Sequence, residues 1–234
     1  MTVLLYQMDS YIQAFDARVT DVDAEGGRVA LNRTAFYPGG GGQPHDTGRL
    51  GGWRVTKTAR EGEAVWHWIE GEGLPTPGDY LHGAIDWQRR YALMRTHTAM
   101  HILCGVVWRD YGAQVTGGSM EPGKGRMDFE FANLQKELVS EIEARCNAEI
   151  AAARAVRVQI LPREEAFTIP DLIRTKINLL PPAISAIRTV ELVGLDLQAD
   201  GGTHVRNTAE VGAMKVVDYK SKGAINKRIY IELT

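Results

Sequence analysis

The chain has 234 residues, of which 44% are hydrophobic and 24% are charged, as is typical of a globular protein and not of a disordered one. Its formal net charge of −2 and pI of about 6.3 argue against a general basic coat that binds nucleic acid over the whole surface, but they leave room for a local basic patch. Because the sequence has no apolar run of roughly 18 residues, no basic leader and few cysteines, we expect a reduced, cytoplasmic protein without a membrane span.

Residues 1–88 contain short alternating segments between glycine turns, and no amphipathic stretch of helical length interrupts them. Trp66 and Trp68, for example, alternate with polar neighbours after a glycine turn. So many short strands predict a small N-terminal β-barrel domain. His67 and His82 fall in these strand-like segments, where we expect both side chains to face solvent.

From residue 89 onward, long helices are mixed with strands. The segment RRYALMRTHTAMHILCGVVWRDYG is apolar all round, which is typical of a buried helix, and LQKELVSEIEARCNAEIAAARA predicts a long amphipathic helix. Cys104 and Cys146 lie inside these two helices, where we expect packed thiols. REEAFTIPDLI is weakly helical up to its proline.

The remaining segments of this part predict strands. RMDFEF places Met127, Phe129 and Phe131 on one face, VRVQIL and RTVELV are strand-like, and AMKVVDYKSKGAINKRIYIEL predicts a hairpin. This order of elements favours an α+β domain over residues 89–234, with helices packed on a mostly antiparallel sheet.

Two histidines on the first predicted helix form a candidate metal-ligand pair. His97 and His101 are four residues apart in THTAMHIL, so they share a helix face and can point at one ion. Such a pair alone more often consists of packed or surface histidines. A zinc peptidase is excluded, because the residue after the first histidine is Thr98 and not the glutamate that serves as general base.

A zinc site needs further donors, and DGGTHV is the best source of them. Zinc takes four ligands, or three with an open position for water. His204 follows two glycines that let the backbone approach closely, and Asp200 lies four residues before it. Asp200 is either an oxygen ligand or a turn residue, as aspartate before Gly-Gly-Thr often is.

Three segments in this order, FYPGGGGQPHDTG, RTHTAMHIL and DGGTHV, resemble the AlaX family. Its members are free-standing relatives of the editing domain of alanyl-tRNA synthetase. The resemblance covers nearly the whole chain, and the length resembles the medium-sized AlaX class. It implies a glycine-rich β-barrel domain over residues 1–88, followed by a metal-binding editing (deacylase) domain over residues 89–234.

The resemblance implies one Zn²⁺ per chain, with ligands at four positions of this sequence: His97, His101, Asp200 and His204. The family has a cysteine at the position of Asp200, so this chain departs from the pattern there. A carboxylate also binds zinc, but the loss of a soft thiolate should lower the affinity. Coordination by three histidines and Asp200, or by three histidines and a water, are both open.

The family hydrolyses the ester that joins a wrong amino acid, chiefly serine, to tRNA(Ala). Such editing is needed because a pocket built for alanine rejects an added hydroxyl only about a hundredfold. The resemblance therefore implies a deacylase for Ser-tRNA(Ala). With no Ser/His/Asp arrangement and no separate general base, we expect a metal-positioned water, although zinc can also polarise the ester or anchor the substrate.

The resemblance also implies residues that contact substrate. Thr116 in QVTGGSM would recognise the seryl hydroxyl and stand at the catalytic site, against the alternative of a β-branched residue packed at a strand end. The run Gly39, Gly40, Gly41, Gly42 and Gln43 would shape the substrate path; it lacks the Gly-Lys-Ser/Thr ending of a phosphate loop.

Contacts to tRNA phosphates would come from local basic clusters. The candidates are Arg89, Arg90 and Arg95, then Lys124 with Arg126, then Lys220, Lys222, Lys227 and Arg228. Of these, Arg95 and Arg126 are the predicted substrate-binding residues.

Two other functions remain open. The first is a deacylase of another misacylated tRNA, such as glycyl-tRNA. The second is a non-catalytic tRNA-binding module whose metal is structural or absent, with Asp200 marking a decayed site. Measurements of metal content and of turnover distinguish a deacylase from a non-catalytic module.

Overall fold

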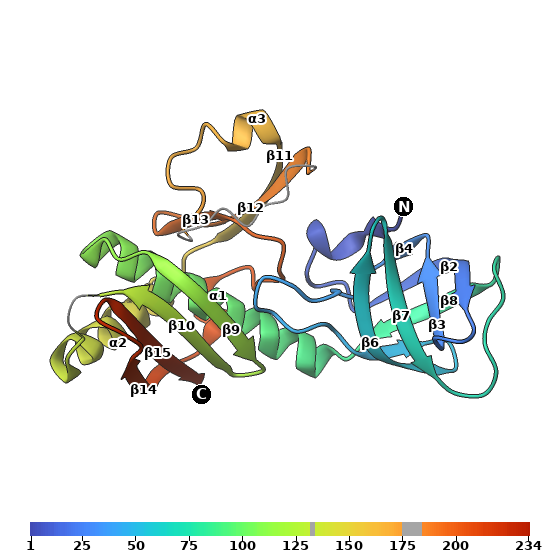
Figure 1. The fold of residues 1–234 in the computed structure, drawn as a ribbon, viewed down its shortest axis with the longest axis horizontal. Helices are drawn as coiled ribbons and strands as arrows, with labels where there is room; N and C mark the ends of the chain where they lie inside the picture. Colours follow the sequence, from blue (N-terminus) through green and yellow to red (C-terminus); the bar gives the residue numbers. More distant parts are fainter. Residues whose placement is uncertain (132–133, 175–183) are drawn as a thin grey trace. The chain divides into compact units, whose positions relative to one another are not determined.

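The computed structural model describes residues 1–131, 134–174 and 184–234. The chain divides into two compact units, Met1–Ala92 and Leu93–Thr234 (Figure 1). Helix α1 (Trp87–Tyr111) begins in the first unit and continues into the second. The predicted domain boundary at residues 88 and 89 lies in the first turn of this helix and stays a prediction.

The first unit is built on a closed barrel of six strands, paired in the order β2-β3-β7-β6-β5-β8. All six pairings are antiparallel. The strands are β2 (Ala14–Asp23), β3 (Arg28–Leu31), β5 (Gly48–Leu50), β6 (Trp53–Glu61), β7 (Ala64–Glu70) and β8 (Tyr80–Ile85). Beside them, β1 (Val3–Leu4) pairs in parallel with β4 (Arg33–Thr34), and η1 (Leu5–Gln7) is a single 3-10 turn.

Strand β7 presents the opposite face from the one its aromatic residues suggest. Val65, His67 and Ile69 are buried, whereas Trp66 and Trp68 are half-buried. The expectation that His67 faces solvent is therefore wrong, while His82 is exposed as predicted.

Polar and cationic partners on both sides of the strand explain this reversal. The Nε2 atom of buried His67 lies 2.9 Å from Thr34 Oγ1, so the imidazole is satisfied inside the barrel. Outside, the Arg28 guanidinium carbon lies 4.6 Å from the Trp66 ring centroid and 5.0 Å from that of Trp68. Cation–π contact makes the outer position favourable for the two indoles.

The second unit contains a four-stranded antiparallel sheet in the order β14-β15-β10-β9 and a three-stranded antiparallel sheet in the order β11-β12-β13. The α+β class and the predominance of antiparallel pairing are thus confirmed. The first sheet comprises β9 (Val115–Glu121), β10 (Lys124–Glu130), β14 (Met214–Ser221) and β15 (Asn226–Leu233), and the second β11 (Val156–Pro162), β12 (Ala186–Leu192) and β13 (Asp196–Ala199). The remaining elements are α2 (Lys136–Ala151), α3 (Arg163–Ala166) and η2 (Thr208–Val211).

Helix α1 packs on the four-stranded sheet, and its apolar residues are buried on several faces, as predicted. Met100 contacts two glycines: a Cβ built at Gly118 would lie 3.2 Å from Met100 Cε, and one at Gly125 would lie 3.1 Å from Met100 Sδ. Both positions therefore favour glycine. Thr96 Oγ1 accepts a hydrogen bond of 2.9 Å from the Gly123 amide, which ties the helix to the β9–β10 turn.

Two further expectations about this unit are confirmed. The strand face of Met127, Phe129 and Phe131 is buried, and so are the thiols of Cys104 and Cys146. Among the described residues, no helix has the length and apolar character needed to cross a membrane.

Candidate metal centre

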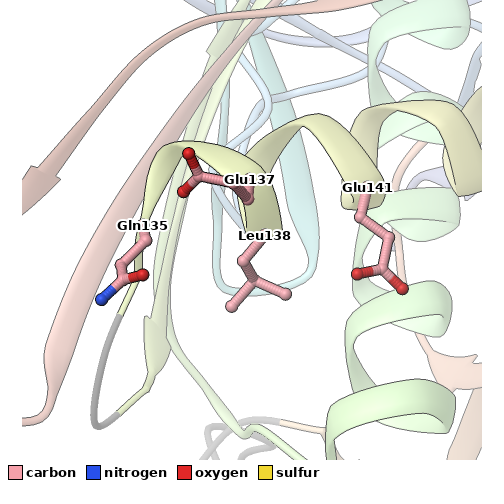
Figure 2. A pocket seen from close by; sticks show the side chains of 4 residues that line it. All are labelled: Gln135, Glu137, Leu138 and Glu141. Atoms are coloured by element: carbon pink, nitrogen blue, oxygen red, sulfur yellow. The ribbon is translucent and has the colours of Figure 1, made fainter.

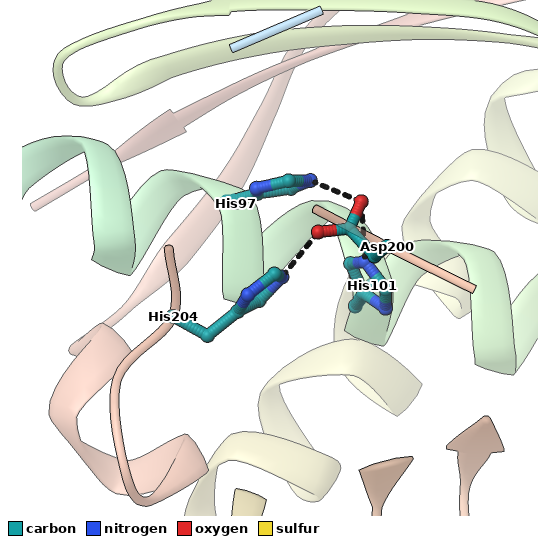
Figure 3. A group of neighbouring side chains, drawn as sticks. All are labelled: His97, His101, Asp200 and His204. Atoms are coloured by element: carbon teal, nitrogen blue, oxygen red, sulfur yellow. Dashed lines mark ion pairs between the residues drawn. The ribbon is translucent and has the colours of Figure 1, made fainter. Parts of the chain in front are cut away.

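Four side chains converge in the second unit (Figure 3): His97 and His101 from α1, and Asp200 and His204 from the segment after β13. We call these four residues the histidine cluster. One ligand atom from each lies within 4.8 Å of all the others. Asp200 Oδ2 lies 3.4 Å from His97 Nε2 and 3.8 Å from His101 Nε2, and Asp200 Oδ1 lies 3.9 Å from His204 Nε2.

The backbone around Asp200 fixes the second half of the cluster. The Asp200 amide donates to the Arg188 carbonyl of β12 (3.0 Å), and the Arg188 guanidinium donates back to the Asp200 carbonyl (2.9 Å). Asp200 Oδ1 also accepts a 2.6 Å hydrogen bond from the Gly202 amide. The aspartate is therefore a turn residue and at the same time faces the imidazoles. The Val205 amide donates to Thr98 Oγ1 (3.2 Å), which ties this segment to α1.

The donor set fits a zinc ion. Ligand atoms at 2.0–2.1 Å from zinc in a tetrahedron are roughly 3.3 Å apart, and the separations from Asp200 to the three imidazoles are 3.4–3.9 Å. The histidines are also well shielded from water, with 5%, 5% and 3% of His97, His101 and His204 exposed. Imidazole and carboxylate are both accepted by zinc, so the four residues suit a single site.

Two members of the cluster are held in the protonation state in which they bind metal. Burial, together with the charges of His97 and His101, holds the pKa of His204 well below its ordinary value, which keeps that ring neutral. Burial alone would raise the pKa of Asp200, but His97 and His101 outweigh it and keep the carboxyl ionised. Neutral imidazole and ionised carboxylate are the forms that bind metal.

Asp196 is a member of this neighbourhood that sequence reasoning missed. Burial lowers the pKa of His101, but the hydrogen bonds to Asp196 and Asp200 outweigh it and raise that pKa to about 9. The His101 Nδ1 atom lies 3.0 Å from Asp196 Oδ2. The only signal in the sequence is its place four residues before Asp200, at the start of β13, and no motif marks it.

Thr116 lies on strand β9 and is exposed. It occupies a β-bulge, since its neighbours Val115 and Gly117 pair with consecutive residues of β10. Its hydroxyl donates to Asn226 Oδ1 at 3.0 Å. The predicted hydroxyl-reading residue is thus accessible, and its known partner is an amide that can both donate and accept.

The glycine run forms the tip of a tight hairpin in the first unit. Gly40 and Gln43 exchange backbone hydrogen bonds of 3.1 and 2.9 Å. The two glycines between them, Gly41 and Gly42, have φ values of +56° and +87°, which residues with a side chain rarely adopt. Gln43 itself is buried, while Gly40, Gly41 and Gly42 are exposed. The exposed part of this segment therefore consists of its glycines.

The base of this hairpin is held by a buried ion pair. Arg90 is fully buried and donates to both carboxylate oxygens of Asp46 and to the Ser10 carbonyl. The Asp46 carboxylate also accepts from the Tyr37 amide at 2.6 Å. The expectation that Arg90 contacts tRNA phosphate is therefore wrong, because all of its side chain is enclosed.

Other predicted phosphate contacts have partners within the protein. Lys227 is buried and donates to the Gly223 and Ala224 carbonyls (both 2.8 Å), so the expectation that it contacts tRNA phosphate is wrong as well. Arg95 donates to the Val211 carbonyl at 2.7 Å. Arg89 donates to the His45 carbonyl at 3.2 Å. Four more of these side chains face carboxylates, namely Arg126 and Arg228 with Asp128, Lys124 with Glu232 and Lys220 with Asp218.

A shallow pocket lies at the start of α2, lined by Gln135, Glu137, Leu138 and Glu141 (Figure 2). Two carboxylates in its wall oppose the approach of a polyanion. None of the predicted site residues lines it, so it does not compete with the histidine cluster as a candidate site.

Comparisons with known proteins agree with these findings. Residues 187–230 match the family described as the threonyl and alanyl tRNA synthetase second additional domain. The chain is 41% identical to the alanyl-tRNA editing protein AlaX-M of Saccharolobus solfataricus, over 98% of each chain. It is 35% identical to AlaX-M of Methanosarcina mazei, over 100% of this chain and 97% of that protein. The alanine–tRNA ligase of Pyrobaculum aerophilum is 37% identical over 91% of this chain, which matches 25% of the ligase.

Proposed function

The chain belongs to the AlaX-M family of alanyl-tRNA editing proteins, and we propose that it is a zinc-dependent deacylase of misacylated tRNA(Ala), chiefly Ser-tRNA(Ala). One observation carries the proposal. Two segments about a hundred residues apart bring three imidazoles and a carboxylate together in a shielded site, and full-length relatives of the chain are named as editing proteins.

The reaction is an ester hydrolysis. A water oxygen bonds to the carbonyl carbon of the aminoacyl ester and the bond from that carbon to the ribose oxygen breaks. The ribose oxygen takes up a proton that the water gives up and becomes a hydroxyl, and the amino acid leaves as a free carboxylate. A zinc ion held by the histidine cluster would supply Lewis acidity to the ester carbonyl and to water. The cluster residues would hold the ion, and their burial keeps bulk solvent from weakening these electrostatic interactions.

We propose that Thr116 distinguishes serine from alanine. Its hydroxyl is exposed and already paired with the Asn226 amide, so a seryl hydroxyl can join a network of groups that donate and accept. Alanine would leave these groups without that partner, which is the physical basis for rejecting a substrate that lacks a hydroxyl. The hairpin residues Gly39, Gly40, Gly41, Gly42 and Gln43, together with Arg95 and Arg126, are the further proposed substrate contacts.

The function is tested by measuring deacylation of Ser-tRNA(Ala) and Ala-tRNA(Ala), each with and without a chelator. We expect fast loss of serine, slow loss of alanine, and strong inhibition by the chelator. Faster hydrolysis of Gly-tRNA(Ala) than of Ser-tRNA(Ala) would mean that the glycyl ester, and not the seryl ester, is the preferred substrate. If the zinc-loaded protein hydrolyses none of these esters, the deacylase proposal is wrong and a non-catalytic tRNA-binding module is the remaining function.

A pair of variants tests the role of Thr116. Thr116→Val removes the hydroxyl and keeps the shape, and we expect Ser-tRNA(Ala) hydrolysis to fall about tenfold, the value of one net hydrogen bond of about 1.4 kcal/mol. Thr116→Ser keeps the hydroxyl and is the matched control. Equal rates for both variants would show that the Thr116 hydroxyl does not contact the substrate. The assignment of the protein as a deacylase would not be affected.

A further inference from the structure

We propose that Asp196 is a positioning residue for the histidine cluster: its buried carboxylate holds the Nδ1–H of His101, so that Nε2 is the atom presented to a metal. The inference rests on the metal-dependent function proposed above. It concerns hydrogen bonds within the chain, however, and can be tested without tRNA.

The carboxylate of Asp196 is fixed by three groups. Its Oδ2 atom lies 3.0 Å from His101 Nδ1 and accepts a 2.7 Å hydrogen bond from Gln198 Nε2. Its Oδ1 atom accepts from Arg174 Nε at 3.4 Å. Arg174 is itself held over the Trp108 ring, with its guanidinium carbon 4.8 Å from the ring centroid. Asp196 is buried, so water does not compete for these contacts.

This arrangement decides which nitrogen of His101 is free to act as a ligand. Both oxygens of Asp196 face donor groups, Gln198 Nε2 at Oδ2 and Arg174 Nε at Oδ1. The carboxyl therefore acts as an acceptor, and the His101 nitrogen that faces it carries the proton. When a metal replaces one proton of His101, the lone pair is therefore on Nε2, the atom that lies 3.8 Å from Asp200 Oδ2 within the cluster. A carboxylate behind a metal-binding imidazole both orients the ring and strengthens it as a ligand.

The chain offers a matched control with the same pair of groups. In the first unit, His82 Nδ1 lies 2.9 Å from Asp16 Oδ1, and both side chains are exposed. Asp16→Asn therefore removes the same kind of contact in a place where no ligand set is assembled.

The first test measures zinc affinity by competition with a chelating dye. We expect Asp196→Asn to bind zinc about 10–100-fold more weakly, as is usual when the group behind a ligating histidine is lost, and Asp16→Asn to match the wild type. A folded Asp196→Asn protein with wild-type affinity would overturn the proposal. So would a variant that only melts at a lower temperature while its folded fraction binds zinc normally.

The second test needs no variant of Asp196 and so holds even if that variant does not fold. Nitrogen-15 NMR of the zinc-loaded wild type, with the His101 signals assigned against His101→Gln, should show the proton on Nδ1 and the metal on Nε2. The reverse assignment overturns the proposal. Because neither test involves ester hydrolysis, a protein without deacylase activity would leave the result standing.

Discussion

Two buried polar groups of the first unit, Arg90 and His67, differ from the histidine cluster of the second unit in how they are paired. In the first unit donors meet acceptors: Arg90 faces the Asp46 carboxylate and two carbonyls, and His67 lies between the Thr34 hydroxyl and a carbonyl. In the second unit, the histidine cluster brings together three imidazoles and a carboxylate. What these four groups share is that each turns an atom that can bind a metal toward the others.

The difference separates stability from function. A buried donor paired with a buried acceptor is complete within the fold, and breaking it is costly because a polar group is left behind. A group of side chains that turn metal-ligand atoms toward one another has its interactions satisfied only when a cation binds between them. We therefore expect changes in the first unit to alter folding, and changes in the histidine cluster to alter metal binding and turnover.

Removing one histidine of the cluster should have the largest effect. We expect His97→Ala to lower deacylation of Ser-tRNA(Ala) by about 10³-fold and to abolish zinc binding, because Lewis-acid stabilisation of several kcal/mol is lost. The measurement is single-turnover deacylation beside zinc content. His82→Ala, at an exposed histidine of the first unit, is the control and should behave as wild type. Deacylation that survives the loss of zinc would place the chemistry elsewhere.

Breaking the ion pair at the base of the hairpin should have the next largest effect, on folding alone. Arg90→Ala leaves the Asp46 carboxylate buried without its main partner, and we expect the free energy of unfolding in urea to fall by about 3–5 kcal/mol. Arg89→Ala removes only hydrogen bonds to the His45 carbonyl and should cost about 1 kcal/mol. Equal costs for the two variants would contradict a structural role for the buried pair.

His67 should make the stability of the protein depend on pH. Burial lowers its pKa from 6.5 to about 4, so between these values the unfolded chain binds a proton that the folded chain does not. The stabilising contribution is therefore complete above pH 6.5 and is lost as the pH falls toward 4. It amounts to roughly 3 kcal/mol at 1.36 kcal/mol per pKa unit.

This pH dependence is checked by urea unfolding of metal-free protein at several pH values from 7 to 4.5. His67→Gln should flatten the slope relative to wild type, since glutamine does not titrate. His82→Gln is the matched control at an exposed histidine. A wild-type slope in His67→Gln would mean that other groups cause the acid sensitivity.

The same contrast explains what the sequence could predict. The histidine pair follows from helix periodicity, and both its helix and the alternating strand of Met127 and Phe129 are found as expected. His67 was misassigned because two tryptophans outweigh one histidine in any hydrophobic pattern. Only tertiary contacts reveal that Arg28 shelters the indoles outside while Thr34 satisfies the imidazole inside.

Asp196 was missed and Arg90 was given a wrong role for a related reason. Each is a charged residue whose role depends on a partner far away in the chain, His101 in one case and Asp46 in the other. Local composition describes such residues as solvated charges, since most are. Their burial is decided by long-range pairing that no spacing rule contains.

The smallest effect we predict concerns Asp200, where this chain departs from the family's cysteine. Asp200→Cys supplies a soft thiolate, and we expect zinc to bind about tenfold more tightly, equivalent to about 1.4 kcal/mol. Asp200→Asn keeps an oxygen that can accept from the Gly202 amide but removes the charge, so it should bind zinc more weakly than wild type. Competition with a chelating dye measures both. If the two variants bind zinc as the wild type does, three histidines alone hold the ion and Asp200 is a turn residue. Opposite shifts for cysteine and asparagine would make Asp200 the fourth ligand.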